Sequence, residues 1–179
     1  MPNRNSKDIF VMMLSNVRKK SADTARAYRR LGEAAESSEL KQDLEARAFI
    51  TENDLKSLDH CFERIGEKPV VIPFHLEAAL VEDVLASDFE GTLAQLETSA
   101  SRNLYILAKA AELVQQSITE YPILISAAEV TGHHVLGVVL ETILAHKLAL
   151  MERDRRLERD LIEGEIAKSG SLADLQAAA

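Results

Sequence analysis

The chain has little of what most folds use to turn or to cross-link: one cysteine, four prolines, seven glycines and no tryptophan in 179 residues. The single cysteine, Cys61, excludes a disulfide within the chain and is typical of a reducing compartment, so we expect a cytoplasmic protein. Aromatic residues make up only 4% of the chain, which disfavours a sandwich or barrel core. Because turn-forming residues are scarce, the elements must be long, and the composition predicts an all-α protein packed through alanine and leucine.

The sequence also lacks the features that are typical of several classes of function. The first residues have no apolar segment of the signal-peptide kind, and no apolar run approaches the ~20 residues of a membrane span. The net charge of −8 argues against a nucleic-acid partner, since phosphate binding needs a basic face. The sequence contains no phosphate-binding glycine loop, nucleophile elbow or Cys-x-x-Cys motif, so nucleotide, acyl-transfer and dithiol chemistry have no support.

Apolar residues recur every three or four positions over most of the chain, which is the spacing of one buried helix face. The predicted elements are long helices over about 6–35, 39–65, 87–116 and 133–163, an extended crossing segment at 68–73 and a short helix at about 74–86. Capping boxes are expected at Ser87–Glu90 and Ser117–Glu120, with Pro122 in a first helical turn. A break at Thr131-Gly132 separates the last long helix from what precedes it.

Four long helices, a tight hinge at 36–38 and a long crossover after the second helix describe a ferritin-like four-helix bundle. We expect a single domain over residues 1–179, with its core at about 6–163 and a flexible C-terminal tail at 165–179. Two polar residues, Arg47 and Thr51, lie on or beside the apolar stripe of the second helix. Polar groups in a bundle core are unfavourable unless paired, so they suggest a site or the remnant of one.

The second helix and its flanks carry a family resemblance. The matching features are Ala35, Ser37-Ser38, Glu39-Leu40-Lys41, Thr51-Glu52, Leu58, Phe62 and the closing Gly66-Glu67-Lys68-Pro69. This block resembles the bacterial stress-associated ferritin-like proteins of the YciF type. Residues 104–110 and 144–157 resemble the family's last two helices less specifically. The resemblance covers most of 8–163 and implies a ferritin-like bundle that is often dimeric, linked to stress and of poorly defined biochemical role.

Members of this family that keep a di-metal centre draw carboxylates and histidines from four helices. At the matching positions this chain has Ser21, Arg47 and Ile50, and only Glu97 and His146 remain as candidate ligands. Two ligands do not hold a di-iron centre, so we expect no cofactor. The alternative is an iron or manganese site that uses Glu97, His146, Glu129 and His133.

In place of metal we expect an interior polar cluster at the same position, made of Ser21, Arg47, Thr51, Glu97 and His146. Arg47 could take over the role of metal charge by pairing with Glu97. In the other interpretation, the Arg47 side chain extends outward to solvent, and Glu97 lies at the solvent-exposed border of the apolar face of its helix.

Three kinds of function remain. The leading hypothesis is a non-catalytic helical bundle, a homodimer related to stress, which acts through contacts with a protein the sequence does not identify. The second is a metal-binding oxidoreductase of the di-iron type. The third is an amphipathic protein that adsorbs to a granule or membrane surface.

Overall fold

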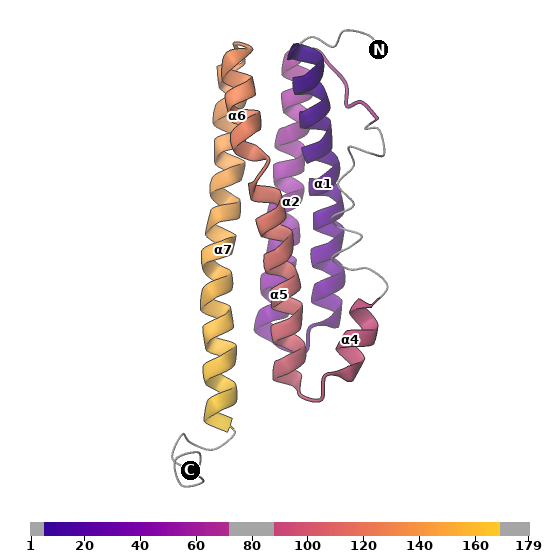
Figure 1. Cartoon of the computed structure of the whole chain (residues 1–179), viewed down its shortest axis with the longest axis vertical. Helices are drawn as coiled ribbons and strands as arrows, with labels where there is room; N and C mark the ends of the chain where they lie inside the picture. The colour runs from indigo at the N-terminus through magenta and orange to yellow at the C-terminus, as the bar shows by residue number, and fades with distance from the viewer. Residues whose placement is uncertain (1–5, 72–87, 169–179) are drawn as a thin grey trace.

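The computed structural model describes residues 6–71 and 88–168. Within those ranges every regular element is a helix: α1 (Ser6–Ala34), α2 (Ser38–Ile65), α4 (Phe89–Gln95), α5 (Ser99–Ile118), α6 (Tyr121–Val130) and α7 (His134–Lys168). Figure 1 shows α1 and α2 as a hairpin, with α5 and α6 following one another along its length and α7 running beside them. The predicted all-α helical bundle is confirmed.

The first hairpin forms where the sequence predicts it. The backbone N–H of Leu40 donates to the Ser37 side chain, which caps α2. Gly66 ends α2 with φ of 67°, a left-handed conformation in which a β-carbon would be strained. Residues 35–37 join the two helices, and a connection this short is typical of an antiparallel return.

The predicted long third helix over 87–116 is wrong, because the chain breaks at residues 96–98 and forms α4 and α5 separately. Ser87 lies outside the described residues, and Asp88 caps α4 without a side-chain hydrogen bond. The capping box that does form joins Thr98 and Ser101 at the start of α5. Their hydroxyls bond to the local backbone in a way that competes with an uninterrupted helix.

The predicted capping box at Ser117–Glu120 is also wrong. The Ser117 hydroxyl donates to the Val114 carbonyl inside α5, and the Glu120 carboxylate pairs with Lys20 of α1. Pro122 does lie in the first turn of α6, as predicted.

The break before the last helix is confirmed, since Gly132 has φ of 78°. Helix α7 then runs to Lys168, beyond the predicted end at 163. Residues 68–71 belong to no helix, whereas the predicted short helix at 74–86 and the tail after 168 lie outside the described residues.

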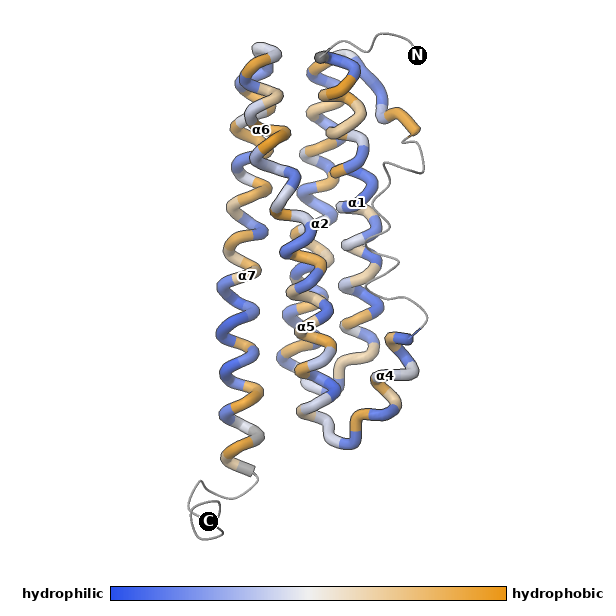
Figure 2. Tube along the Cα trace, in the orientation of Figure 1, coloured by the Kyte–Doolittle hydropathy of each residue, from blue (hydrophilic) through white to orange (hydrophobic). Residues whose placement is uncertain are grey.

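Two apolar clusters form the core. One is built around Leu31, Leu44 and Leu107, and the other, toward the start of α1, around Phe10, Cys61 and Leu140. On α1, α2 and α7 the positions between the clusters are polar but still buried, and they include Ser21, Thr24, Thr51, Asp54 and Lys147. Figure 2 shows the alternation of hydrophobic and hydrophilic residues along these helices. A polar layer therefore crosses the middle of the bundle.

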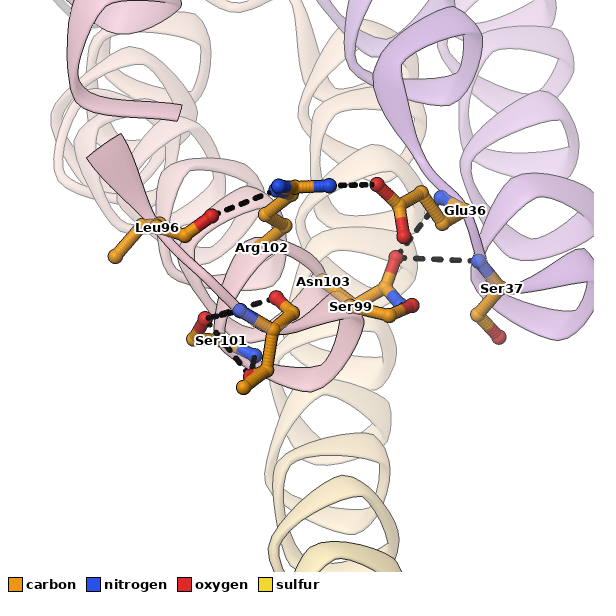
Figure 3. Close-up of polar contacts among 8 residues, drawn as sticks. Glu36, Ser37, Leu96, Ser99, Ser101, Arg102 and Asn103 are labelled. Carbon is orange, nitrogen blue, oxygen red and sulfur yellow. Dashed lines mark hydrogen bonds and ion pairs between the residues drawn. The ribbon is translucent and has the colours of Figure 1, made fainter. Parts of the chain in front are cut away.

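A second polar contact fixes the α1–α2 hinge to the start of α5 (Figure 3). The buried Asn103 side chain accepts hydrogen bonds from the backbone N–H groups of Glu36 and Ser37, with N···O distances of 3.0 and 3.2 Å. Arg102 donates to the Leu96 carbonyl and to the Glu36 carboxylate. The Arg102 hydrogen bond lowers the pKa of Glu36. One amide thus satisfies the two donors that the hinge leaves unpaired.

Replacing Asn103 with Ala should lower the free energy of unfolding by about 1–3 kcal/mol, because two backbone donors lose their acceptor. Asn103→Asp keeps the acceptor oxygen and should recover much of that loss. Urea unfolding of the three proteins measures the difference. Equal stability of the Ala and Asp variants would show that the acceptor is unimportant.

Candidate functional site: a buried charge network

Arg47 lies in the middle of α2 with a side chain that is 0% exposed. Its Nε donates to Asp43 Oδ2 at 2.5 Å, one turn earlier on the same helix. Its Nη2 lies 2.6 Å from Asp154 Oδ1 on α7. This second contact is an ion pair that joins α2 to α7. The guanidinium is therefore held between two carboxylates.

Helix spacing brings these groups together. Asp43, Arg47 and Thr51 are four residues apart, so they share the buried face of α2. On α7, Lys147 and Asp154 are seven residues apart and share the face that meets the bundle. Arg153 of α7 also reaches Asp43, as an ion pair. Two ion pairs, Asp43–Arg153 and Arg47–Asp154, and the polar contact between Asp54 and His146 join α2 to α7.

Burial and the paired charges together set the pKa values of this group. It raises the pKa of Asp154, and the neighbouring Arg47 offsets that rise only in part. Burial also acts to lower the pKa of Arg47, but the contact with Asp154 and the charge of Asp43 outweigh it, so the pKa of Arg47 is raised. Burial likewise raises the pKa of Tyr28, which lies against the network on α1. Arg47 therefore stays charged and Tyr28 neutral at physiological pH.

A second group lies further along α2 and closer to the start of α7. Asp54 Oδ1 is 2.9 Å from Nδ1 of His146, whose side chain is 48% exposed. Lys147 is buried, with its Nζ 5.5 Å from the centre of the Tyr121 ring. Burial raises the pKa of Asp54 more than the His146 hydrogen bond lowers it, and burial lowers the pKa of Lys147. Burial raises the pKa of the Tyr121 hydroxyl, and its contact with Ser21 offsets part of that rise.

The structure brings together only part of the predicted interior cluster. Ser21 and Thr51 are buried in the polar layer, and His146 reaches its edge through Asp54. Arg47 is buried one turn before Thr51, between Leu44 and Ala48 of the first apolar cluster. Glu97 is exposed in the break between α4 and α5. The predicted Arg47–Glu97 pair is therefore wrong, because the helix that would carry Glu97 inward does not continue through it. The carboxylates that Arg47 needs come from Asp43 and Asp154.

The residues of the alternative metal site do not converge. Glu129 is exposed on α6, and His133 stacks on Phe10 with ring centres 5.9 Å apart. Among the described residues, no group of three or more His, Cys, Asp or Glu side chains is placed to hold a metal ion. Within the polar layer, Asp54 and His146 form the one close pair of such residues, and Lys147 lies beside them where a cation would be repelled.

The sequence did not lead us to four buried charged residues, Asp43, Asp54, Lys147 and Asp154. Periodicity could have found Asp154, which falls between Leu150 and Leu157 on the α7 stripe. It could also have found Asp43, one turn before Arg47. The buried residue is Lys147 rather than its neighbour His146, a difference of one position that a periodic pattern does not resolve.

Comparisons with known proteins agree with this bundle. The model of a family described as a domain of unknown function, DUF892, matches residues 5–165. The structure resembles the Escherichia coli stress protein YciF, with a TM-score of 0.77 and 19% identity over 90% of this chain and 99% of that one. It also resembles YcfI of Rhodopseudomonas palustris, which is provisionally described as a structural protein, with a TM-score of 0.73 and 21% identity over 85% and 94% of the two chains.

A third solved structure, of a protein from Xanthomonas campestris, matches with a TM-score of 0.69 and 14% identity over 92% of this chain and 99% of that one. No curated protein sequence matches the chain. At these identities the structural likenesses establish the shared fold.

Arg47→Met should lower the free energy of unfolding by about 3–5 kcal/mol, because Asp154 is left buried without its cation. The double variant Arg47→Met/Asp154→Asn should recover part of this loss, since Asp43 keeps Arg153. Arg155→Met is the matched control: its side chain is 68% exposed and pairs loosely with Glu152, so we expect ~0–1 kcal/mol. Additive effects in a double-mutant cycle would contradict the Arg47–Asp154 contact.

The raised pKa of Asp54 determines whether its contribution to the stability of the fold rises or falls with pH. A carboxyl whose pKa is higher in the folded state binds its proton more readily there, so it contributes stability as the pH falls from neutral towards about 4. Relative to Asp54→Asn, the wild-type chain should therefore gain stability over this range. The comparison is made in a His146→Gln background, which removes the titration of the neighbouring imidazole. A loss of relative stability on acidification would show that Asp54 is stabilised as an anion.

Proposed function

The chain belongs to the DUF892 family, a domain of unknown function, and from this premise we propose that it is a non-catalytic helical bundle that acts through protein contacts. Its buried charged residues would have a structural role. A metal centre at the same position would instead need several ligands that converge on an open site. The surface of the bundle, rather than its centre, would then be its working part.

The placement of the Arg47 guanidinium carries this proposal. A metal centre in a bundle needs several carboxylates that converge on a cation. Here two carboxylates, Asp43 and Asp154, already converge on a cation supplied by the chain. A guanidinium stays charged at every physiological pH and has no lone pair to offer, so it repels a metal ion from this position and cannot act as a ligand. Its full burial also keeps solvent and substrate away from the pair.

Stress physiology is the setting that fits this proposal, because the E. coli structural neighbour is described as a stress protein. A bundle without chemistry of its own could contribute there by binding and covering another protein. Transcript levels under osmotic, oxidative and starvation stress test the setting separately from the biochemical role. Transcript levels that stay constant under all three stresses would refute the link to stress. They would not affect the proposal that the protein acts through protein contacts.

We expect the purified chain to carry no stoichiometric iron, manganese or zinc, and its melting temperature to be unchanged by a chelator. Elemental analysis by mass spectrometry measures the first quantity and differential scanning fluorimetry the second. About two metal ions per chain, lost in an Asp54→Asn or His146→Gln variant, would instead establish a metal site in the bundle and refute the proposal. Metal that survives both substitutions would locate the centre elsewhere and refute it equally.

A further inference from the structure

Helix α4 is held to the bundle mainly through one side chain. Among its residues, Phe89 is the one that is buried, at 3% exposed, and Leu93 is partly buried against the same apolar cluster. The residues at 90, 91, 94 and 95 are exposed. Figure 1 shows α4 at the edge of the bundle, beside the end of α1. The attachment of α4 therefore depends on where the Phe89 ring lies.

The Phe89 ring contacts both α1 and α5. It stacks on Tyr105 of α5, with ring centres 5.7 Å apart and an angle of 18° between the planes. The guanidinium carbon of Arg30 on α1 lies 6.0 Å from the centre of the Phe89 ring. The Lys109 ammonium, one turn further along α5, lies 5.7 Å from the centre of the Tyr105 ring. Both cations are attracted to the electron-rich ring faces. We call Arg30, Tyr105 and Lys109 the aromatic socket.

The residue after the ring adds a charge contact. Arg30 Nη2 lies 2.6 Å from Glu90 Oε1, so the guanidinium that meets the Phe89 ring also binds the next carboxylate. The two side chains are 49% and 77% exposed, and an ion pair so open to water contributes little to holding α4. The pair nevertheless describes the ligand that fits the socket. It is an aromatic residue followed directly by an acidic one.

Helix α4 has little stability of its own. Seven residues are fewer than an isolated helix needs in water, and Gly91 in its interior is unfavourable for a helix. Asp88 at its start makes no side-chain capping bond. Beyond α4, Arg102 of α5 donates to the Leu96 carbonyl at 2.8 Å, so the chain after α4 has its own attachment. Helix α4 can therefore leave the bundle locally while the long helices stay in place.

Resting on the proposed contact role, we propose that the aromatic socket binds an aromatic residue followed by an acidic one on a partner protein, which displaces α4. The chain's own Phe89-Glu90 pair defines what the socket accepts. When α4 leaves, Arg30 loses the carboxylate of Glu90, and an incoming acidic residue restores the pair. A tethered occupant has an effective concentration in the millimolar range. A partner must therefore add contacts of its own, so that α4 is displaced only by a protein that fits a wider surface.

A second copy of the chain is the rival source of the same residues, because its own α4 carries them. Exchange of α4 between two chains would fill each socket with contacts identical to those already present. At micromolar protein, a helix from another chain also competes poorly with one tethered at millimolar effective concentration. A foreign partner has no such limit, since it can contact surfaces that α4 does not cover.

A labelled peptide with the sequence of residues 88–97 tests the socket on the full chain by fluorescence anisotropy. Phe89→Ala empties the socket and should bind the peptide saturably. The wild-type chain should bind it about tenfold more weakly or less, because its own ring competes. The same peptide with alanine at position 89 should not bind. Absence of binding to Phe89→Ala, equal binding to the wild type, or equal binding of the alanine peptide overturns the inference.

Two neighbouring arginines provide a matched comparison in the Phe89→Ala background. Arg30→Gln should weaken peptide binding about fivefold, because the ring and the carboxylate both lose their cation. Arg29→Gln is the control: Arg29 is also exposed on α1 but pairs with Glu52 of α2, so its loss should leave binding unchanged. An equal loss in both variants would reflect general charge attraction and overturn the socket.

A tryptophan variant keeps the inference testable if Phe89→Ala fails to fold, which circular dichroism would reveal. The chain has no tryptophan, so the emission of Phe89→Trp reports on this ring alone. Peptide 88–97 at millimolar concentration should displace the indole and shift its emission to longer wavelength, and the alanine peptide should not. Unchanged emission with both peptides overturns the inference.

Light scattering with and without the peptide identifies the rival occupant. A wild-type dimer that the peptide dissociates has exchanged its α4 helices, which overturns the foreign partner in favour of a second copy. Metal content is measured on the same samples. A metal-free chain that does not bind the peptide refutes the socket, while the proposed contact role survives at another surface. A metal-loaded chain refutes the proposed function, and peptide binding by that chain supports the socket alone.

Discussion

A guanidinium enclosed in an apolar bundle can exist only where anions meet it, and the arrangement of α2 against α7 follows from that requirement. Moving Arg47 out of water is strongly unfavourable unless the interior supplies carboxylates at contact distance. Asp43 supplies one from the same helix, so it places no demand on the rest of the fold. Asp154 supplies the other from α7, and a slide of α7 by one turn would separate the two groups. Apolar contacts tolerate such slides far better, so we infer that the charged contacts fix the register of α7.

The polar layer also explains why the core is divided. Ser21 and Thr24 on α1, Thr51 and Asp54 on α2 and Lys147 on α7 lie at about the same level between the two apolar clusters. Each cluster is large enough to anchor one half of the bundle. The layer between them adds little apolar burial, because its side chains carry hydroxyls, a carboxylate and an ammonium group.

The sequence predicted the helical bundle because helix periodicity is strongest in long elements. The α1–α2 hairpin, its Ser37 cap and the Gly66 stop were predictable from local chemistry, since these signals act within one turn. The third long helix was not, because its apolar pattern continues across residues 96–98, where the chain leaves the helix and Thr98 and Ser101 form a capping box. Asn103 and Arg102, just after this break, bind the α1–α2 hinge, and contacts so distant in sequence leave no local pattern. Burial of Arg47 could be anticipated, but its partner Asp154 is more than a hundred positions away in sequence, and distance of that kind leaves no local pattern.

Cys61 has a practical consequence. It is the chain's one thiol, it is 1% exposed in the cluster around Phe10, and burial raises its pKa to about 11. A thiol reacts as its thiolate, so at neutral pH this side chain is both shielded and almost wholly protonated. Maleimide dyes, spin labels and disulfide reporters can therefore be directed to an introduced surface cysteine while the native residue stays in place. The wild-type chain is its own unlabelled background.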